Sequence, residues 1–316
     1  MEHALVSKEN LKDIHHAGTA MRFLTAYFAT KSESSIVLTG SQRMQERPIA
    51  LLVDALRSLG ADINYTKEEG YPPLEIIGKR LAGGKVCLPA NISSQYISAL
   101  LLIAPRLNQG LELELEGEIT SLPYIKMTLA LLKRVGITST FEGKIIRIPN
   151  QEDISHPAQT VESDWSSASY WFSAIALSDK GEVELSNYRE DSLQGDAVLR
   201  DIYAQLGVES KFNGSKLLLR KKENFVLPAS LELDLVEAPD IAQTIAVSCY
   251  GLGVACHLSG LHTLKIKETD RLVALENELS KLGASITVDE KSLRLAGTQN
   301  FQANQSIDTY NDHRMA

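Results

Sequence analysis

Apolar residues recur along the chain at intervals of three and four within segments that each end at a glycine. The spacing i, i+3, i+4 and i+7 predicts an amphipathic helix in every such segment. A glycine directly after the last turn suits the left-handed conformation of a C-terminal helix cap. Short runs of strand-forming residues follow the helices, as at residues 145–148 and 217–219, and predict β-strands. The helical segments are residues 51–61, 131–137, 198–208 and 272–284.

The spacing of these segments indicates an internal repeat. Their final glycines lie 76, 71 and 76 residues apart and are Gly60, Gly136, Gly207 and Gly283. The starts of a second set of helices lie 76, 73, 73 and 73 residues apart and are Gly18, Ser94, Ser167, Asp240 and His313. Two markers with one period predict repeated units of helix, strand, helix and three strands, with chance similarity of amphipathic helices as the alternative. Because the fifth start lies at residue 313, we expect the chain to stop inside a unit and to be a fragment.

Length and composition fit two ordinary globular domains. The chain has 316 residues, and a domain takes about 150. A content of 44% hydrophobic and 23% charged residues allows a sizeable core and excludes a disordered or collagen-like chain. The cysteines, Cys87, Cys249 and Cys256, are too few for a disulfide framework or a four-ligand zinc site. We therefore expect a reducing, cytoplasmic location.

Charge and hydropathy argue against two classes of partner. The net charge is −8 and no run of five like charges occurs, which disfavours a nucleic-acid surface. The most apolar stretch, residues 241–256, contains Gln243, Thr244 and Ser248 and predicts a buried helix instead of a membrane span. The first residues lack the shape of a signal peptide. We expect no nucleic-acid partner and no membrane partner.

Several unusual polar residues lie at the starts of the predicted helices. Free N–H groups and the positive end of the helix dipole favour phosphate and carboxylate there. Small residues around Gly18 would let a ligand approach the backbone, with Arg22 as a nearby cation. A plain helix start with a surface arginine explains them equally well. The serines at two further starts could bind anions or act only as N-caps, and they are Ser93, Ser94, Ser166 and Ser167.

Arg43, in the loop of residues 40–48, is a candidate anion clamp. A guanidinium binds a carboxylate or phosphate through two parallel hydrogen bonds. A solvated helix start is the alternative for Arg43, and Arg47 could pair with Glu46 or another local carboxylate.

A later repeat has charged residues at the position that corresponds to the loop of residues 40–48, namely Lys267, Glu268 and Arg271. Lys267 and Arg271 would share a face if the segment were helical, although a solvated charged turn is the alternative. Asp240, at a repeat junction, could be an N-cap or a proton-transfer group. Tyr124 is more often a packing residue than a ligand.

Metal and cofactor motifs are not found. The seven histidines show no metal-ligand spacing. The sequence contains no phosphate-binding Gly-x-x-x-x-Gly-Lys-Ser/Thr motif and no Gly-x-Ser-x-Gly nucleophile motif. We expect neither a metal nor an organic cofactor.

Seven motifs occur in an order that resembles one enzyme family over the whole chain, the EPSP synthases or 3-phosphoshikimate 1-carboxyvinyltransferases. Each motif alone is only weakly specific for this family, but the seven motifs in this order are highly specific for it. They are Ala17-Gly18-Thr19-Ala20-Met21-Arg22, Arg43-Met44-Gln45-Glu46-Arg47-Pro48, Ser93-Ser94-Gln95, Ser121-Leu122-Pro123-Tyr124, Asp164-Trp165-Ser166-Ser167-Ala168-Ser169-Tyr170, Lys267-Glu268-Thr269-Asp270-Arg271 and Asn311-Asp312-His313-Arg314-Met315-Ala316.

The resemblance implies a mixed α/β (α+β) architecture, the two-domain enolpyruvyl transferase fold. This inside-out α/β barrel is made of repeated βαβαββ units, three in each domain, which close on ligands between them. It implies domains at residues 1–162 and 163–316, with the first unit and most of the last missing. The family's N-terminal Lys-Ser…Arg segment and a C-terminal Lys, which bind both substrates, lie outside this sequence. We therefore expect little or no transferase activity, and a monomer.

By resemblance, the reaction moves the enolpyruvyl group of phosphoenolpyruvate to the 5-hydroxyl of shikimate 3-phosphate, through a tetrahedral intermediate, and releases phosphate. The family pattern implies catalytic roles for Asp240, Glu268, Lys267 and His313. It implies a phosphoenolpyruvate site formed by Gly18, Arg43, Gln95, Arg271 and Arg314. It implies shikimate 3-phosphate contacts from Ser93, Ser94, Gln95, Ser121, Tyr124, Asp240, Thr263 and Lys267.

Two positions depart from the family pattern. His16 replaces a common Asn before Ala-Gly-Thr, and Thr263 stands where an Asn usually contacts shikimate. The alternative enzyme is UDP-N-acetylglucosamine enolpyruvyl transferase, whose family carries a reactive Cys on the loop corresponding to residues 40–48. Gln42, Arg43 and Met44 occupy that loop here. A non-catalytic binding fragment is the alternative from another class.

Overall fold

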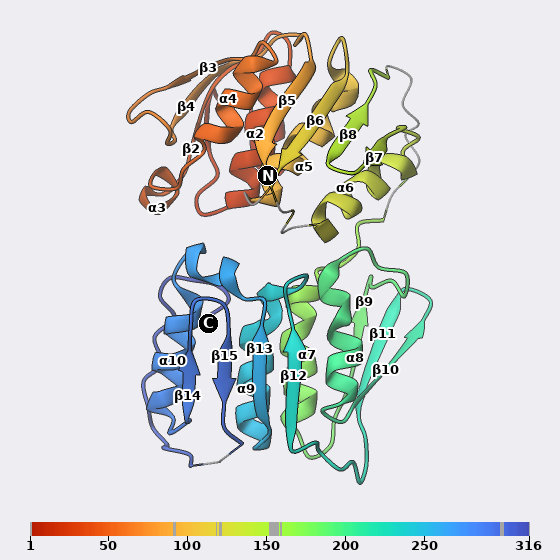
Figure 1. Cartoon of the computed structure of the whole chain (residues 1–316), viewed down its shortest axis with the longest axis vertical. Coiled ribbons are helices and arrows are strands. Elements are labelled where there is room, and N and C mark those ends of the chain that lie inside the picture. The colour runs from red at the N-terminus through yellow and green to blue at the C-terminus, as the bar shows by residue number, and fades with distance from the viewer. Residues whose placement is uncertain are drawn as a thin grey trace. The chain divides into compact units, whose positions relative to one another are not determined.

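A computed structural model of the chain describes residues 2–90, 93–117, 119, 122–151, 158, 160–297 and 300–315. The chain forms two compact units, residues 1–158 and 159–316, where the sequence predicted a boundary between residues 162 and 163. Each unit has its own cluster of buried apolar side chains. We call them unit 1 and unit 2 and describe each by itself (Figure 1).

Unit 1 contains two four-stranded sheets with the same topology. Their strand orders are β1-β2-β4-β3 and β5-β6-β8-β7. In both, the first two strands are parallel and the remaining pairs are antiparallel. The strands are β1 (Leu11–Asp13), β2 (Ser35–Thr39), β3 (Asp62–Tyr65), β4 (Leu74–Ile77), β5 (Gly84–Pro89), β6 (Leu111–Glu116), β7 (Thr140–Glu142) and β8 (Ile145–Ile148). The helices are α1 (Glu2–Val6), α2 (Gly18–Thr30), α3 (Gln42–Gln45), α4 (Ala50–Ser58), α5 (Ser94–Ile103), the 3₁₀ turn η1 (Ala104–Arg106) and α6 (Leu122–Arg134).

Unit 2 repeats this organisation. Its sheets have the orders β12-β13-β15-β14 and, among the described residues, β10-β11-β9. The strands are β9 (Glu182–Ser186), β10 (Val208–Asn213), β11 (Lys216–Lys221), β12 (Ser230–Asp234), β13 (Ala255–Ser259), β14 (Ile286–Val288) and β15 (Leu293–Leu295). The helices are α7 (Trp165–Leu177), α8 (Leu199–Ala204), α9 (Ala242–Leu252) and α10 (Arg271–Lys281), with 3₁₀ turns η2 (Gly195–Val198), η3 (Pro239–Ile241) and η4 (His262–Ile266). The predicted repeat of helix, strand, helix and three strands is therefore confirmed from α2 to β5 and from α7 to β12.

The glycines that marked the repeat have the predicted left-handed conformation, with φ values of 102° at Gly60, 85° at Gly136, 82° at Gly207 and 93° at Gly283. After α4, the Gly60 N–H donates to the Arg57 carbonyl and the Ala61 N–H donates to the Leu56 carbonyl, both at 2.9 Å. This pair of bonds is a Schellman cap, and it recurs after α6 and α10. A glycine at this position avoids the steric cost that a Cβ has at positive φ.

Within each unit, the first helices of the two repeats pack against each other. In unit 1, α2 lies beside α5, and in unit 2, α7 lies beside α9 (Figure 1). Because parallel packing of equivalent helices brings their starts to one end of a unit, the polar residues at these starts collect there. The strands show the complementary pattern: along β6, Leu111, Leu113 and Leu115 are buried while the glutamates between them face solvent.

The fifth predicted helix start forms turns at residues 310–314. No helix is assigned within residues 300–315, which follow β15 without regular secondary structure. We call these residues the C-terminal segment.

Candidate active site

A buried arginine organises the charged residues of unit 2. Arg271 is 1% exposed, and its Nη1 donates to Asp240 Oδ1 at 2.9 Å and its Nη2 to Glu268 Oε2 at 2.8 Å. It also donates to both oxygens of Asp312, from Nε at 2.7 Å and from Nη2 at 3.0 Å. Lys267 Nζ lies 3.3 Å from Asp240 Oδ1. We call these five residues the Arg271 cluster.

The local backbone explains how the Arg271 cluster forms. Lys267 has an extended conformation directly after η4, and α10 begins at Arg271. Asp270 caps α10 by accepting hydrogen bonds from the N–H groups of Leu272 and Val273. The segment is therefore not one helix with Lys267 and Arg271 on a shared face. The alternative prediction, a solvated charged turn, is also wrong for Arg271, because its guanidinium is buried and donates to carboxylates.

Asp240 is an ion-paired carboxylate and does not cap a helix. It belongs to η3, and the N-cap residue of α9 is Ile241. Burial by itself raises the pKa of the Asp240 carboxyl, but the cations of Lys267, Arg314 and Arg271 outweigh burial and hold this pKa below its ordinary value. Asp240 is therefore ionised at neutral pH.

Arg271 and Asp312 stabilise each other's charged forms. Burial alone raises the pKa of Asp312, but hydrogen bonds from Arg271 and from the Arg314 backbone bring it below the ordinary value. Burial alone lowers the pKa of Arg271, but Asp312, Asp240 and Glu268 raise it. The Arg271 cluster is thus a closely paired network, in which each buried charge has a partner of opposite sign.

Glu278 of α10 fixes the C-terminal segment. This carboxylate is 4% exposed and accepts hydrogen bonds from Tyr310 Oη at 2.7 Å and from the Asp308 N–H at 3.0 Å. Lys281 Nζ donates to Glu278 and to Asp308 Oδ2 at 2.9 Å. These contacts hold the segment immediately before Asp312, so they set where the following residues lie.

His313, Arg314 and Thr263 surround the Arg271 cluster. The His313 side chain is 71% exposed, and its Nδ1 lies 3.8 Å from Asp312 Oδ1. Arg314 Nη1 donates to the Asp240 carbonyl at a long 3.5 Å. Thr263 lies in η4, and its hydroxyl is buried without a hydrogen-bond partner among the described residues. The Arg314 guanidinium therefore lies beside Asp240, and its positive charge favours the ionised form of that carboxyl group.

Two of the predicted residues of unit 1, Gly18 and Gln95, lie where α2 and α5 begin. Gln95 Nε2 donates to Thr19 Oγ1 at 2.9 Å, which joins the two helix starts. The α2 N-terminus has no side-chain cap, so its first N–H groups are not satisfied by a capping side chain. His16 Nδ1 lies 3.0 Å from the hydroxyl of Ser41, which ties the loop of residues 40–48 to the same place.

Arg22 and Arg47 lie on either side of Gly18. A Cβ built on Gly18 would lie 2.7 Å from Arg47 Nη1 and 3.2 Å from Arg22 Nη1. Arg22 is 4% exposed, and its hydrogen bonds go to the carbonyls of Gly18 and Pro48 and to the sulfur of Met44. A buried cation with neutral partners gives the start of α2 a positive potential.

The remaining predicted residues of unit 1 occupy different surroundings. Arg43 is exposed, and its Nη1 lies 3.3 Å from Glu46 Oε2, so Arg43 pairs with Glu46. Ser93 is the N-cap of α5, with Ser94 as the first helical residue. Tyr124 lies in the first turn of α6. Ser121 lies outside the described residues. At the corresponding start of α7, the cap is Asp164, and Ser166 and Ser167 do not serve as N-caps.

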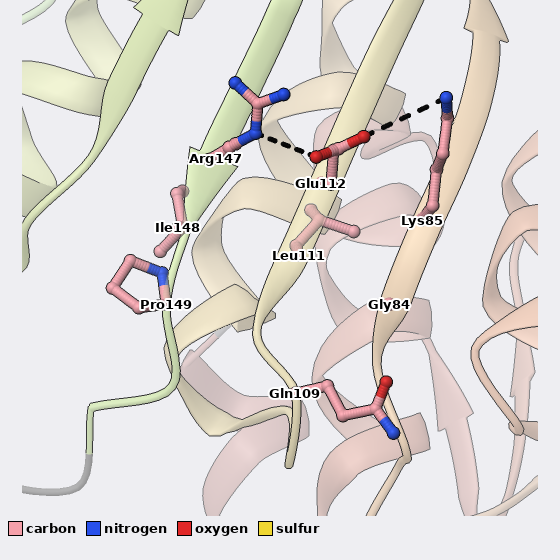
Figure 2. Close-up of a pocket in the computed structure, with 8 residues that line it drawn as sticks. All are labelled: Gly84, Lys85, Gln109, Leu111, Glu112, Arg147, Ile148 and Pro149. Carbon is pink, nitrogen blue, oxygen red and sulfur yellow. Dashed lines mark hydrogen bonds and ion pairs between the residues drawn. The ribbon is translucent and has the colours of Figure 1, made fainter.

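Two hollows on the surface contain none of the predicted site residues. The first, of about 450 Å³, lies on the exposed face of β5, β6 and β8 (Figure 2). Its charged side chains pair with one another: Arg147 Nε donates to Glu112 Oε2 at 2.8 Å, and Lys85 Nζ lies 3.9 Å from Glu112 Oε1. The second, of about 880 Å³, lies at residues 179–182 and 220–226. The candidate site therefore rests on the clusters at the helix starts.

Within the described ranges, His, Cys, Asp and Glu form no group of three or more that could hold a metal ion. Among the helices of the described residues, none is long and apolar enough to cross a membrane.

The fold and these clusters define a class of protein. Repeated βαβαββ units that gather cations and carboxylates at helix starts are typical of an enzyme for anionic small molecules. The chain belongs to the EPSP synthase family: the family model described as EPSP synthase (3-phosphoshikimate 1-carboxyvinyltransferase) matches residues 2–316.

Relatives and solved structures agree with this family. A 3-phosphoshikimate 1-carboxyvinyltransferase of Bacteroides fragilis strain YCH46 is 44% identical over 315 residues, which cover 99% of this chain and 76% of the relative. One from Haemophilus influenzae strain KW20 is 40% identical, covering 95% of this chain and 69% of the relative. The solved EPSP synthase of Acinetobacter baumannii has a TM-score of 0.74 at 22% identity, covering 96% of this chain and 70% of that one. The predicted two-domain fold is confirmed, and the UDP-N-acetylglucosamine alternative is not favoured.

The structure also reveals residues that the sequence analysis did not single out. Asp312 lies inside a recognised motif and pairs with Arg271. Asp196 of η2 is 6% exposed and accepts a hydrogen bond from Ser166. It stands at the start of the second helix of its repeat, the slot held by Arg43 and by Arg271 in other repeats. Comparison of this position in every repeat would therefore have singled out Asp196 from the sequence.

Proposed function

We propose that this chain binds shikimate 3-phosphate and phosphoenolpyruvate and transfers the enolpyruvyl group to the 5-hydroxyl of shikimate 3-phosphate, with release of phosphate. Membership of the family and the names of the relatives support this activity. The structural observation that carries the proposal is the ionised Asp240 carboxylate, held by Lys267 and Arg271 beside Glu268.

The reaction needs groups that move protons. The attacking hydroxyl must lose a proton, and the methylene carbon of phosphoenolpyruvate must gain one before it is lost again. Asp240 would accept the hydroxyl proton because it is ionised at neutral pH. Glu268 and Lys267 would take part in proton transfer at the methylene carbon, and His313 would act beside them.

The reaction also needs cations, because the two substrates together carry two phosphates and two carboxylates. Arg271 donates four hydrogen bonds to carboxylates, so its main task would be to orient Asp240 and Glu268. Arg314 would contribute more directly to anion binding. We propose that phosphoenolpyruvate contacts Gly18, Arg43, Gln95, Arg271 and Arg314. We propose that shikimate 3-phosphate contacts Ser93, Ser94, Gln95, Ser121, Tyr124, Asp240, Thr263 and Lys267.

Calorimetry with shikimate 3-phosphate, followed by phosphoenolpyruvate, tests the binding part of this proposal. Phosphate release measured on the same samples tests the transfer, and robust turnover would contradict the little or no activity that the sequence led us to expect. The variant Asp240→Asn should lose phosphate release and bind shikimate 3-phosphate within a few-fold of the unmodified chain. Asp201→Asn, at an exposed position of α8, is the control. Binding without phosphate release would support the non-catalytic alternative, and binding of UDP-N-acetylglucosamine instead would overturn the assignment.

The proposed activity belongs to the biosynthesis of chorismate and aromatic amino acids, and we propose that it takes place in the cytoplasm. Cys87, Cys249 and Cys256 are free thiols, which agrees with a reducing compartment. We also propose a monomer, which sedimentation velocity would test.

A further inference from the structure

Arg22 is a buried cation that the chemistry proposed above does not use. The residue is 4% exposed, and its guanidinium donates to the carbonyls of Gly18 and Pro48 at 3.1 and 3.4 Å and to the sulfur of Met44 at 3.7 Å. Its Nε is buried without a hydrogen-bond partner among the described residues. In the part of the chain that the structure describes, the acceptors of Arg22 are therefore neutral groups and its charge is not balanced by a carboxylate.

These hydrogen bonds connect the start of α2 to the loop of residues 40–48. Gly18 is the first residue of α2, whereas the other two acceptors of Arg22 belong to the loop. The same loop carries Arg43, in the short helix α3. One guanidinium therefore holds the helix start and the loop at a fixed separation.

Tyr96 extends this connection to α5. Tyr96 follows Gln95 in the first turn of α5, and its hydroxyl donates to the Pro48 carbonyl at 2.6 Å. The Arg22 guanidinium lies 5.8 Å from the centre of the Tyr96 ring, which is within the range of a cation–π interaction. Three elements thus meet at Arg22, and each of them carries one of the predicted phosphoenolpyruvate contacts of unit 1.

The charge of Arg22 lies where a cation is unfavourable in the absence of an anion. The start of α2 is the positive end of the helix dipole and has no capping side chain. A second guanidinium lies at the same point, because a Cβ on Gly18 would be 2.7 Å from Arg47 Nη1 and 3.2 Å from Arg22 Nη1. Burial of a charge without a counter-ion is costly as well. An anion bound at the start of α2 would offset all of these costs.

We propose that Arg22 is a positioning residue for the phosphate group of phosphoenolpyruvate. It holds the start of α2, the loop of residues 40–48 and α5 in the arrangement that binds the anion. Its N–H groups donate to protein acceptors, so Arg22 acts on the ligand through the positions of Gly18 and Arg43 and through its positive charge. This inference rests on the proposed function, because it takes phosphoenolpyruvate as the anion that binds at Gly18.

The first test compares two arginines of unit 1 that have similar contacts. Arg57, in the last turn of α4, also donates to a main-chain carbonyl, that of Ile63 at 2.8 and 3.0 Å, and lies 5.0 Å from the centre of the Tyr65 ring. Unlike Arg22, it has carboxylates at 3.5 and 3.8 Å. Arg57→Gln is therefore the matched control for Arg22→Gln.

Phosphoenolpyruvate is titrated by calorimetry into each protein saturated with shikimate 3-phosphate. We expect Arg22→Gln to weaken phosphoenolpyruvate binding roughly tenfold, whereas Arg57→Gln should leave it nearly unchanged. The affinity for shikimate 3-phosphate should change little in both variants. Arg22→Lys keeps the charge but loses the planar fork that reaches two carbonyls, so its affinity for phosphoenolpyruvate should be intermediate.

A purely structural role of Arg22 would give a different result. The affinities for both substrates would then fall together in Arg22→Gln, or Arg57→Gln would lose as much phosphoenolpyruvate affinity as Arg22→Gln. Either result would overturn the inference. No recovery of affinity in Arg22→Lys would overturn the contribution assigned to the charge. Thermal unfolding checks that each variant is folded.

The second test needs neither substrate. The chain labelled with ¹⁵N-glycine is titrated with inorganic phosphate and, separately, with sodium chloride of the same ionic strength. We expect phosphate alone to shift the Gly18 N–H resonance in the unmodified chain and in Arg57→Gln, and to shift it much less in Arg22→Gln. No shift in the unmodified chain, or equal shifts in both variants, would reject the inference. A response of Gly18 to phosphate without binding of phosphoenolpyruvate would count against the proposed function and would still support the role of Arg22 in holding a phosphate group.

Discussion

Arg271 and Asp312 are joined by two hydrogen bonds although 41 positions separate them in the chain. Arg271 begins α10, whereas Asp312 belongs to the C-terminal segment. The pair therefore fastens an irregular segment to the start of a helix. It also keeps Arg271 oriented so that its other nitrogen atoms reach Asp240 and Glu268.

Replacing Arg271 by glutamine should strongly destabilise unit 2. The substitution leaves Asp240 and Asp312, whose side chains are 14% and 0% exposed, without their main counter-ion. Breaking a buried ion pair in this way costs roughly 3–5 kcal/mol. Urea unfolding of the full chain measures the loss. Arg189→Gln is the matched control, because Arg189 pairs with Asp191 at the surface and its loss should have little effect. Equal unfolding free energies for Arg271→Gln and Arg189→Gln would contradict the assigned role.

The carboxyl groups near Arg314 should give opposite dependences of stability on pH. The pKa of Asp240 and of Asp312 is lowered in the folded chain. Their contribution is therefore fully present above the unfolded value of about 3.9 and is lost as the pH falls through the folded values. The pKa of Asp196 is raised to about 6, so folding retains a proton that the unfolded chain has released. The contribution of Asp196 to the stability of the fold is present below about pH 4 and is lost as the pH rises to about 6.

The variant Asp196→Asn isolates the pH dependence of stability that comes from Asp196. The variant should gain stability relative to the unmodified chain when the pH rises from 4 to 7, by at most about 3 kcal/mol, since one pKa unit corresponds to about 1.4 kcal/mol. Urea unfolding at both pH values provides the comparison. A stability difference that does not change with pH would show that Asp196 titrates normally.

Tyr310→Phe should weaken both the fold and the binding of phosphoenolpyruvate. The substitution removes the 2.7 Å hydrogen bond to Glu278, one of the contacts that position the C-terminal segment. The expected loss of unfolding free energy is about 1 kcal/mol, whereas the affinity for phosphoenolpyruvate should fall several-fold, because the segment carries Arg314. Calorimetry and urea unfolding separate the two effects. Unchanged affinity would mean that the Arg271–Asp312 pair alone positions Arg314.

The repeat could be predicted because its signal is local. A glycine after an amphipathic helix needs only the helix before it to adopt positive φ, so Gly60, Gly136 and Gly283 identified their caps correctly. The same holds for Ser93 as an N-cap. Spacing likewise identified β8 and the middle of β11 without any knowledge of the tertiary structure.

The pairing of charges could not be predicted, because it depends on residues that meet only in the folded unit. Nothing near Arg271 in the sequence shows that Asp312 would bind it, and a charged run such as residues 265–271 is usually solvated. The hydrogen bond of Asp196 could not be predicted for the same reason, because its partner Ser166 lies 30 positions earlier. The family resemblance named Arg271 as a phosphoenolpyruvate contact and Asp240 as a catalytic residue, but the structure was needed to show that one orients the other.

Gly18→Ala should reduce affinity for phosphoenolpyruvate and leave the fold nearly unchanged. Gly18 begins α2 without a positive φ, so an alanine can adopt its backbone conformation. The new Cβ would lie 2.7 Å from Arg47 Nη1, at the far end of a flexible side chain, and 3.2 Å from Arg22 Nη1. Arg47 must move, and the methyl group also covers the uncapped N–H groups of the helix start. We therefore expect at least a several-fold weaker affinity in calorimetry, with an unfolding free energy within about 0.5 kcal/mol of the unmodified chain. If phosphoenolpyruvate bound equally well to both proteins, Gly18 would not belong to its site.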